Sequence, residues 1–228
     1  MQIKSISLVA VGVTTFISMA ASANIIAGWS IATAIPAATT GTSYNYGVAD
    51  SGDVATGTML SSAHALAATT YSSPAGNGST YSFSANNWTA GDYVQVSVAT
   101  TGYSDVSISW DQTRSGTGPA SFELVMSTDG GTNWSTLIAS YAVVQAGLAG
   151  SGTTTWNTVT NQAGFTITSI ATDAANQGNV LFRMRTLVTT AAAGTNRVDN
   201  IVVSGNVAPA PGAIALLGLA GLIGRRRR

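Results

Sequence analysis

Apolar and polar residues alternate with a period of two in several short segments, and this pattern limits the fold more than any other feature of the chain. The segments are 92–100, 105–113, 121–128, 165–168, 180–187 and 198–204. Side chains of a β-strand point alternately to opposite faces, so the pattern indicates antiparallel strands with one face buried. Since residues 24–206 show no long helical pattern, we predict an all-β protein built as an antiparallel β-sandwich.

The alternation also selects the side chains of the core. The apolar faces carry Val94, Val96, Val98, Val106, Ile108, Trp110, Phe122, Leu124, Met126, Phe165, Ile167, Val180, Phe182 and Met184. We expect Trp110, Phe122, Leu124, Phe182 and Met184 to form one buried cluster between two sheets. Residues 30–80, rich in Ala, Thr, Ser and Gly, should add strands and loops, but the pattern does not set their register.

The first residues have the organisation of a secretory signal. Lys4 gives a positive start, residues 6–19 are mostly apolar, and Ala21-Ser22-Ala23 is an A-x-A cleavage site. We therefore predict that residues 1–23 are a signal peptide and that the mature chain starts at Asn24. One β-sandwich domain, residues 24–206, follows.

Residues 207–228 combine an apolar segment with a cluster of positive charges. The uncharged stretch Ala213–Gly224 runs directly into Arg225, Arg226, Arg227 and Arg228. Positive charge keeps its end of a membrane segment cytoplasmic, so we predict a single short membrane helix. The stretch is shorter than the ~20 residues that usually span a bilayer, which suits an anchor that is later removed.

Pro209-Ala210-Pro211 precedes this segment, and the whole order resembles the PEP-CTERM sorting signal of bacterial envelope proteins. The resemblance implies a transient stay in the cytoplasmic membrane, processing by an exosortase-type enzyme, and delivery to the cell surface or the extracellular space. Ala210 departs from the family, which typically carries Glu there. The alternative is an ordinary C-terminal membrane anchor.

Composition excludes several classes of function. The chain has no cysteine, and therefore no disulfide and no thiolate metal site. Between residues 24 and 206 the acidic residues outnumber the four arginines, which are Arg114, Arg183, Arg185 and Arg197. A mildly acidic domain without a basic patch is a poor binder of nucleic acid.

Residues 127–134 form a sharper local motif. The sequence S-T-D-G-G-T-N-W places Ser127, Asp129, Gly131 and Trp134 as in the Asp-box of many secreted β proteins, which it resembles. Asp129 can accept hydrogen bonds from nearby backbone N–H groups, and the glycines tolerate positive φ. The resemblance implies a structural hairpin turn with Trp134 folded back over it.

The segment 196–205 looks like the closing strand of jelly-roll modules, many of which bind carbohydrate. In that group an Asp near this strand sometimes joins a structural calcium site, so Asp199 is a candidate ligand. The alternative is that Asp199 and Asn200 make hydrogen bonds at the strand start. Asp50 and Asp53 form a second oxygen-rich loop, but it lacks the EF-hand pattern. We predict no other cofactor.

Catalytic motifs are absent from the sequence. The single histidine, His64, is expected in a loop or at the surface, and no G-x-S-x-G, H-E-x-x-H or P-loop occurs. Asp111 and Glu123 are the one carboxyl pair that could face outward together, on neighbouring strands, and ion pairing with Arg183 and Arg185 explains them more simply. We predict that the protein is not an enzyme.

Three tryptophans, Trp29, Trp88 and Trp156, lie near predicted turns and could present flat faces to sugar rings. The main prediction for function is an exported surface or extracellular-matrix protein with a structural or adhesive role. The alternative is a carbohydrate-binding module, with or without a stabilising calcium, that acts on exopolysaccharide.

Overall fold

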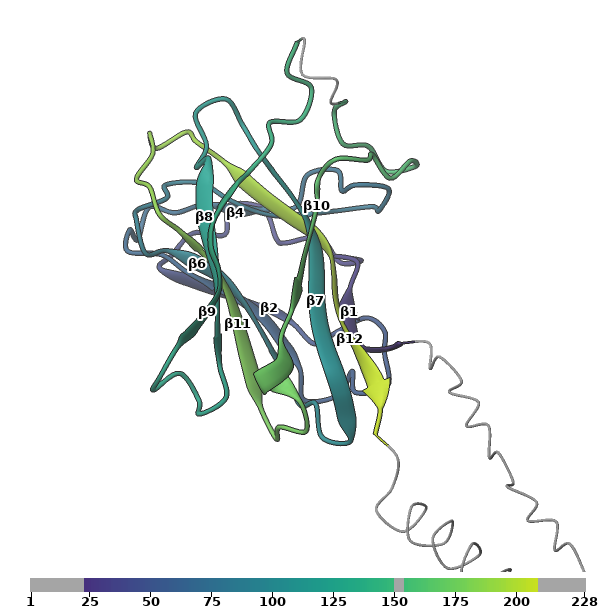
Figure 1. Ribbon diagram of the computed structural model, residues 1–228. Helices are drawn as coiled ribbons and strands as arrows, with labels where there is room; N and C mark the ends of the chain where they lie inside the picture. Colours follow the sequence, from purple (N-terminus) through teal and green to yellow (C-terminus); the bar gives the residue numbers. More distant parts are fainter. Residues whose placement is uncertain (1–22, 150–153, 209–228) are drawn as a thin grey trace, which may run out of the picture.

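The computed structural model describes residues 23–149 and 154–208, which form twelve β-strands and one short 3-10 helix (Figure 1). All strand pairs are antiparallel, so the prediction of an antiparallel all-β protein is confirmed. Residues 1–22 and 209–228, with nearly all of the predicted signal peptide and the motif residues Pro209, Ala210, Pro211 and Arg225–Arg228, lie outside the described residues. Within the two described ranges, no helix is long and apolar enough to cross a membrane.

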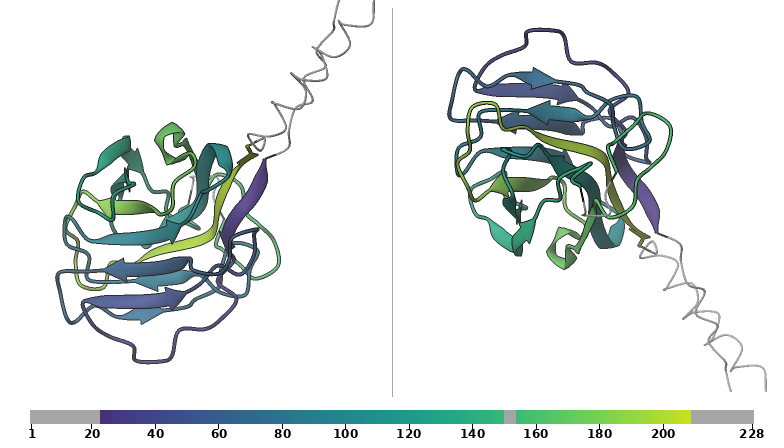
Figure 2. Two further views of the ribbon diagram at one scale, coloured as in Figure 1. Left: turned by 90° about the horizontal axis from the view of Figure 1, so that it is seen from below. Right: turned by 90° about the horizontal axis from the view of Figure 1, so that it is seen from above.

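Two six-stranded sheets face each other as two layers (Figure 2). Sheet I has the order β10 (Thr166–Ile170), β7 (Tyr103–Arg114), β12 (Asn196–Val207), β5 (Phe83–Ala85) and β4 (Tyr71–Ser72), and β1 (Asn24–Trp29) also pairs with β12. Sheet II has the order β2 (Ser43–Gly47), β3 (Met59–Ala63), β6 (Tyr93–Val98), β11 (Val180–Thr186), β8 (Ser121–Ser127) and β9 (Ser135–Ala142). The 3-10 helix η1 spans Thr172–Ala174.

One core lies between the sheets. The five residues predicted to form a buried cluster all have no solvent exposure: Trp110, Phe122, Leu124, Phe182 and Met184. They come from β7 in sheet I and from β8 and β11 in sheet II, as the alternating pattern requires. The Tyr141 ring on β9 bridges the two layers, because it contacts both Trp110 and Phe122. The predicted cluster is therefore confirmed.

Strand β12 is the centre of sheet I. One of its edges pairs with β7 along most of its length, and its other edge pairs with β5 near residue 197 and with β1 near residue 203. The ladder with β7 is interrupted between Asp199 and Val202, where Asn200 has a φ of 48°. Asparagine tolerates this left-handed conformation better than most residues, so the bulge occurs where the sequence allows it.

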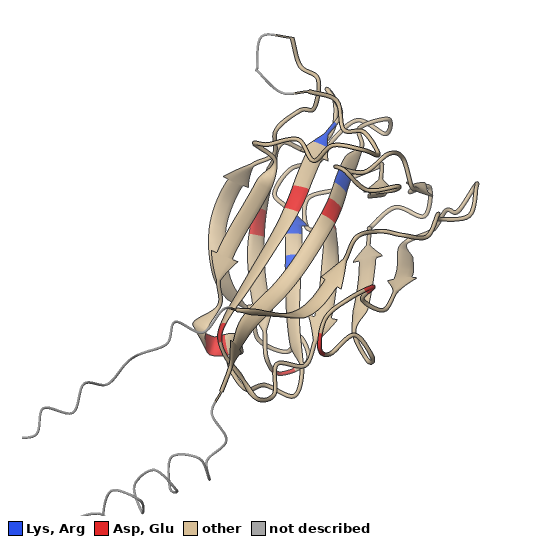
Figure 3. Ribbon diagram, turned by 90° about the vertical axis from the view of Figure 1, so that its right-hand side faces the viewer, with Lys and Arg blue, Asp and Glu red and all other residues tan. Residues whose placement is uncertain are grey.

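The outer faces of the two sheets differ. Loops around residues 77 and 161 fold over sheet I, where Asn77 contacts both Asp111 on β7 and Asp199 on β12. Outward side chains in the middle of sheet II, such as Gln95 and Arg183, keep partial solvent exposure. Charged residues are sparse over the whole ribbon, and both sheets carry some of them (Figure 3).

Candidate functional site

Three rows of side chains cross the outer surface of sheet II, and we call this set the outer face. The strand registers align Met59, Ser97, Leu181 and Ser127 in the first row, Ser61, Gln95, Arg183, Val125 and Thr136 in the second, and Ala63, Tyr93, Arg185 and Glu123 in the third. The residues between them, such as Val96 and Phe182, point into the core. Period-two geometry thus brings aromatic and planar polar groups from three neighbouring strands together.

Arg183 is the centre of the outer face. Its guanidinium carbon lies 3.9 Å from the centroid of the Tyr93 ring and 4.0 Å from that of Trp134. Its Nε donates to Gln95 Oε1 at 2.6 Å. Burial lowers the pKa of Arg183, and the neighbouring Arg185 lowers it further. Stacking on both rings fixes the guanidinium in one orientation.

Arg185 and Glu123 form an ion pair one row away. Arg185 Nε donates to Glu123 Oε1 at 2.7 Å, between side chains that are both partly exposed. The prediction of surface ion pairing is confirmed for this pair. The predicted carboxyl pair of Asp111 and Glu123 is wrong, because Asp111 lies on β7 in sheet I, where loops bury it.

The hairpin turn between β8 and β9 positions Trp134. Ser127 Oγ donates to Asp129 Oδ1 at 2.7 Å, and the Gly131 N–H donates to Ser127 Oγ at 2.9 Å. The Asn133 N–H and side-chain amide donate to the Asp129 carboxylate, and these bonds lower the pKa of Asp129 to about 2. Trp134 Nε1 donates to the Gly131 carbonyl at 2.9 Å. The local geometry thus has the hydrogen bonds expected of an Asp-box turn.

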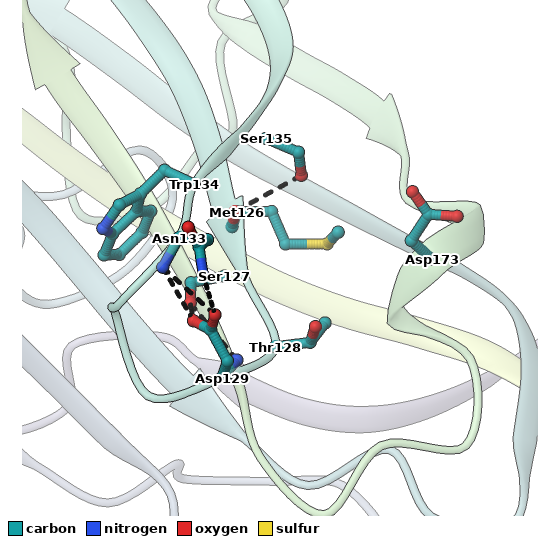
Figure 4. Close-up of a pocket in the computed structure, with 8 residues that line it drawn as sticks. All are labelled: Met126, Ser127, Thr128, Asp129, Asn133, Trp134, Ser135 and Asp173. Atoms are coloured by element: carbon teal, nitrogen blue, oxygen red, sulfur yellow. Dashed lines mark hydrogen bonds between the residues drawn. The ribbon is translucent and has the colours of Figure 1, made fainter.

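A cavity of about 280 Å³ opens beside this turn (Figure 4). Its lining includes Met126, Thr128 and Trp134, together with Asp173 from η1. The cavity lies at one end of the sandwich, between the β8–β9 turn of sheet II and η1, which follows β10 of sheet I.

The three tryptophans predicted to contact sugars are not on the surface. Trp29 and Trp88 are 1% exposed and Trp156 is 2% exposed. Trp29 and Trp88 pack into the core, and Trp156 packs edge-on against Phe165. Burial of so large an apolar area stabilises the fold, and it removes these rings from any ligand. The prediction that they contact glycans is wrong, and Trp134, assigned only to its hairpin, is the tryptophan on the outer face.

The candidate calcium ligands have protein partners. Asp199 accepts hydrogen bonds from the Asn77 N–H at 2.7 Å, from Ser79 Oγ at 2.6 Å and from the Asn200 N–H at 2.8 Å. Of the alternative prediction, hydrogen bonding at the strand start, only the bond from Asn200 is local, because Asn77 and Ser79 belong to a loop far away in sequence. Burial raises the pKa of Asp199 to about 6, and the nearby Asp111 acts in the same direction.

Asp50 and Asp53 also serve the fold. Asp50 accepts from the Ser30 N–H at 2.6 Å, and Asp53 accepts from the Tyr103 hydroxyl at 2.8 Å. These contacts fix the loop after β2 against the residue that follows β1 and against the start of β7. In the part of the chain that the structure describes, no group of three or more His, Asp or Glu residues is placed to hold a metal ion.

His64 is buried, so the prediction of a loop or surface imidazole is wrong. Its ring centroid lies 4.3 Å from that of Trp88, its Nε2 lies 3.0 Å from Ser62 Oγ, and its Nδ1 lies 3.2 Å from Asp92 Oδ2. The three polar residues are in the order of a hydrolase triad. However, all of them are buried, and the Ser62 hydroxyl donates to the Tyr93 carbonyl at 2.9 Å. A serine nucleophile must be accessible and must donate its proton to the histidine, whereas this hydroxyl is buried and donates to a carbonyl, so this group is structural.

Comparison with known proteins finds distant structural likenesses only. No protein-family model matches the chain. No curated protein matches it either. The CBM22-1 and GH10 modules of endo-1,4-β-D-xylanase 10B from Clostridium thermocellum, complexed with xylohexaose, align at 14% identity and a TM-score of 0.44, over 80% of this chain and 28% of that one.

Two further structures align over nearly their full length. The K1 cleaved adhesin domain of Lys-gingipain from Porphyromonas gingivalis W83 has 14% identity and a TM-score of 0.44, over 78% of this chain and 97% of that one. The family 11 carbohydrate-binding module of the cellulase Lic26A-Cel5E from Clostridium thermocellum has 12% identity and a TM-score of 0.37, over 85% and 99%. With TM-scores below 0.5, these likenesses are too distant to transfer a ligand or a function.

Proposed function

We propose that this protein binds a polysaccharide through the outer face of sheet II. The observation that carries the proposal is the stack of Tyr93, Arg183 and Trp134, with Gln95 bonded to its central guanidinium. Sugars combine C–H faces that pack on aromatic rings with hydroxyl groups that pair with planar polar side chains. The outer face offers both kinds of group on rigid strands, partly exposed and held in place before a ligand arrives.

The connections between strands fit this use. From β6 onward the chain changes sheet at most turns, which we interpret as a jelly-roll-like sandwich. The partners of Arg183 come from β6 and from the β8–β9 hairpin, far apart in sequence. These residues come together only in the folded domain, so unfolding should abolish binding.

The test is affinity electrophoresis of residues 24–208, which include the whole of β12, in gels that contain neutral or acidic polysaccharides. We expect at least one polymer to retard the protein, and Trp134→Ala to reduce the affinity about tenfold, because stacking on one ring contributes ~1 kcal/mol or more. Leu148→Ala, an exposed apolar change outside the outer face, is the control. If no polymer retards the wild type, or if Trp134→Ala binds as tightly as the wild type and the control, the proposal is wrong.

We also propose that the chain is exported and sorted to the cell surface, with the exosortase-type processing that residues 207–228 suggest. One observation supports this proposal: β1 and β12 are paired neighbours, with Asn24 opposite Gly205, so both ends of the domain leave it side by side (Figure 1). A domain tethered at one point leaves its sheet faces available for a structural or adhesive role.

Changing all four terminal arginines to serine tests the sorting proposal. Without positive charge at its end, the apolar segment should no longer be held in one orientation. We expect weaker membrane retention and altered C-terminal processing, measured by cell fractionation and by mass spectrometry of the mature protein. Retention and trimming identical to the wild type would instead favour a passive hydrophobic tail.

A further inference from the structure

The guanidinium of Arg183 has one edge that the protein leaves free. Its two faces are covered by the Tyr93 and Trp134 rings, and its Nε is bonded to Gln95. Among the described residues, its two terminal nitrogens have no hydrogen-bond partner, and no carboxylate lies within ion-pair distance. A charged fork with four terminal N–H groups is thus fixed on a partly exposed surface.

The other arginines of the domain are used differently. Arg185 is paired with Glu123, and Arg114 donates to the carbonyl groups of Val143, Ser115 and Gly116. Arg197, on β12 in sheet I, also has no carboxylate partner within the described residues, but no aromatic ring stacks on it. Arg183 alone combines an unpaired charge with a fixed orientation on the outer face.

We propose that this edge binds a carboxylate, and that the polysaccharide recognised by the outer face contains uronic acid residues. The inference rests on the proposed function and names its class of ligand. The planar fork of a guanidinium matches a carboxylate in two parallel hydrogen bonds, which are stronger than those to a neutral hydroxyl. The stacked rings have already removed water from both faces of the guanidinium and restrict the side chain. Binding therefore costs little further conformational entropy.

The surrounding charges agree with this ligand. Arg185 lies two residues further along the same strand, in the next row of the outer face. A second positive group therefore points to the same side of sheet II, and its ion pair with Glu123 holds it in place. The domain as a whole is acidic, which opposes a polyanion at long range. At physiological salt this repulsion is screened over about 8 Å, whereas a direct contact with Arg183 is not. We therefore expect recognition by contact, without long-range attraction.

The experiment compares each uronate polymer with its own carboxyl-reduced form, which has the same backbone but neutral sugars. Polygalacturonate, alginate and a glucuronan are used in affinity electrophoresis at 0.15 M salt. We expect at least one uronate polymer to bind at least tenfold more tightly than its reduced form. Arg183→Gln should lower the affinity for that polymer about tenfold more than it lowers the affinity for the reduced form, because only the uronate loses a charged partner.

Two further variants keep the outcome clear. Arg197→Gln removes the same charge from the other sheet and should bind like the wild type. Arg183→Lys keeps the charge but not the fork, and should recover only part of the affinity. Thermal unfolding shows whether Arg183→Gln is folded; if it is not, the comparison of uronate and reduced polymers on the wild type alone decides.

The inference and the proposed function fail in different ways. If the wild type binds neutral polymers as tightly as uronate polymers, or if Arg183→Gln weakens both forms equally, the uronate inference is wrong and polysaccharide binding stands. If no polymer of either kind retards the wild type, the proposed function itself is wrong.

Discussion

Asp199 shows how one buried side chain makes stability depend on pH. It has no solvent exposure, and burial raises its pKa to about 6 although three protein donors favour its charged form. A pKa that is raised in the folded state means that the folded protein binds the proton more tightly than the unfolded chain. The stability from this group is therefore full below pH 4 and is lost as the pH rises through 6.

We predict that Asp199→Asn flattens this dependence. The shift from 3.8 to about 6 corresponds to roughly 3 kcal/mol between pH 4 and pH 7, which the variant should not show. Urea unfolding at several pH values measures this change, as the difference in unfolding free energy between the variant and the wild type. That difference cancels His64, whose pKa is lowered by burial and whose contribution to stability therefore falls with acid. If the stability of the variant and that of the wild type depended on pH in the same way, the raised pKa of Asp199 would be contradicted.

At this scale, the sequence predicts orientation well and burial less well. Alternation correctly placed Trp110 and Phe182 in the core, because a strand residue has only two directions available. It failed for Asp111, which points outward from β7 as expected but is covered by a loop that contains Asn77. Whether a loop covers an outward residue depends on distant contacts. The burial of His64 could have been predicted from the same alternation. Leu60, Ser62 and His64 are spaced by two, so they share one face of the strand and its extension, and all three are buried.

At the scale of elements, the β8–β9 hairpin was predictable because its hydrogen bonds are local. Ser127, Asp129 and Gly131 bond within one turn, and Gly130 and Gly131 both have positive φ. The partner of Trp134 was not predictable, because Arg183 reaches it only when β11 pairs with β8. Strand pairing is set by the whole fold, and short strands such as β4 and β5 carry too few residues for a periodic pattern.

For the whole molecule, the single core gives a direct test of the sandwich. Trp110 contacts Tyr141 from the other sheet and is fully buried. We predict that Trp110→Ala costs ~3–5 kcal/mol of unfolding free energy, as other large-to-small core changes do. Ile170→Ala, on β10 but 72% exposed, is the control and should change stability by less than about 0.5 kcal/mol. Chemical denaturation measures both, and a loss below ~1 kcal/mol for Trp110→Ala would place that face in solvent.

The pairing of β1 with β12 has a consequence for how the chain reaches this structure. The first strand of the domain has no neighbour in sheet I until the last strand arrives, and β5 and β7 also pair with that last strand. A chain made from its N-terminus thus holds three open strand edges until residue 207 is available. Contacts so far apart in sequence form slowly. Folding should accordingly finish in one late, cooperative event, and until then the exposed edges would need protection from wrong partners.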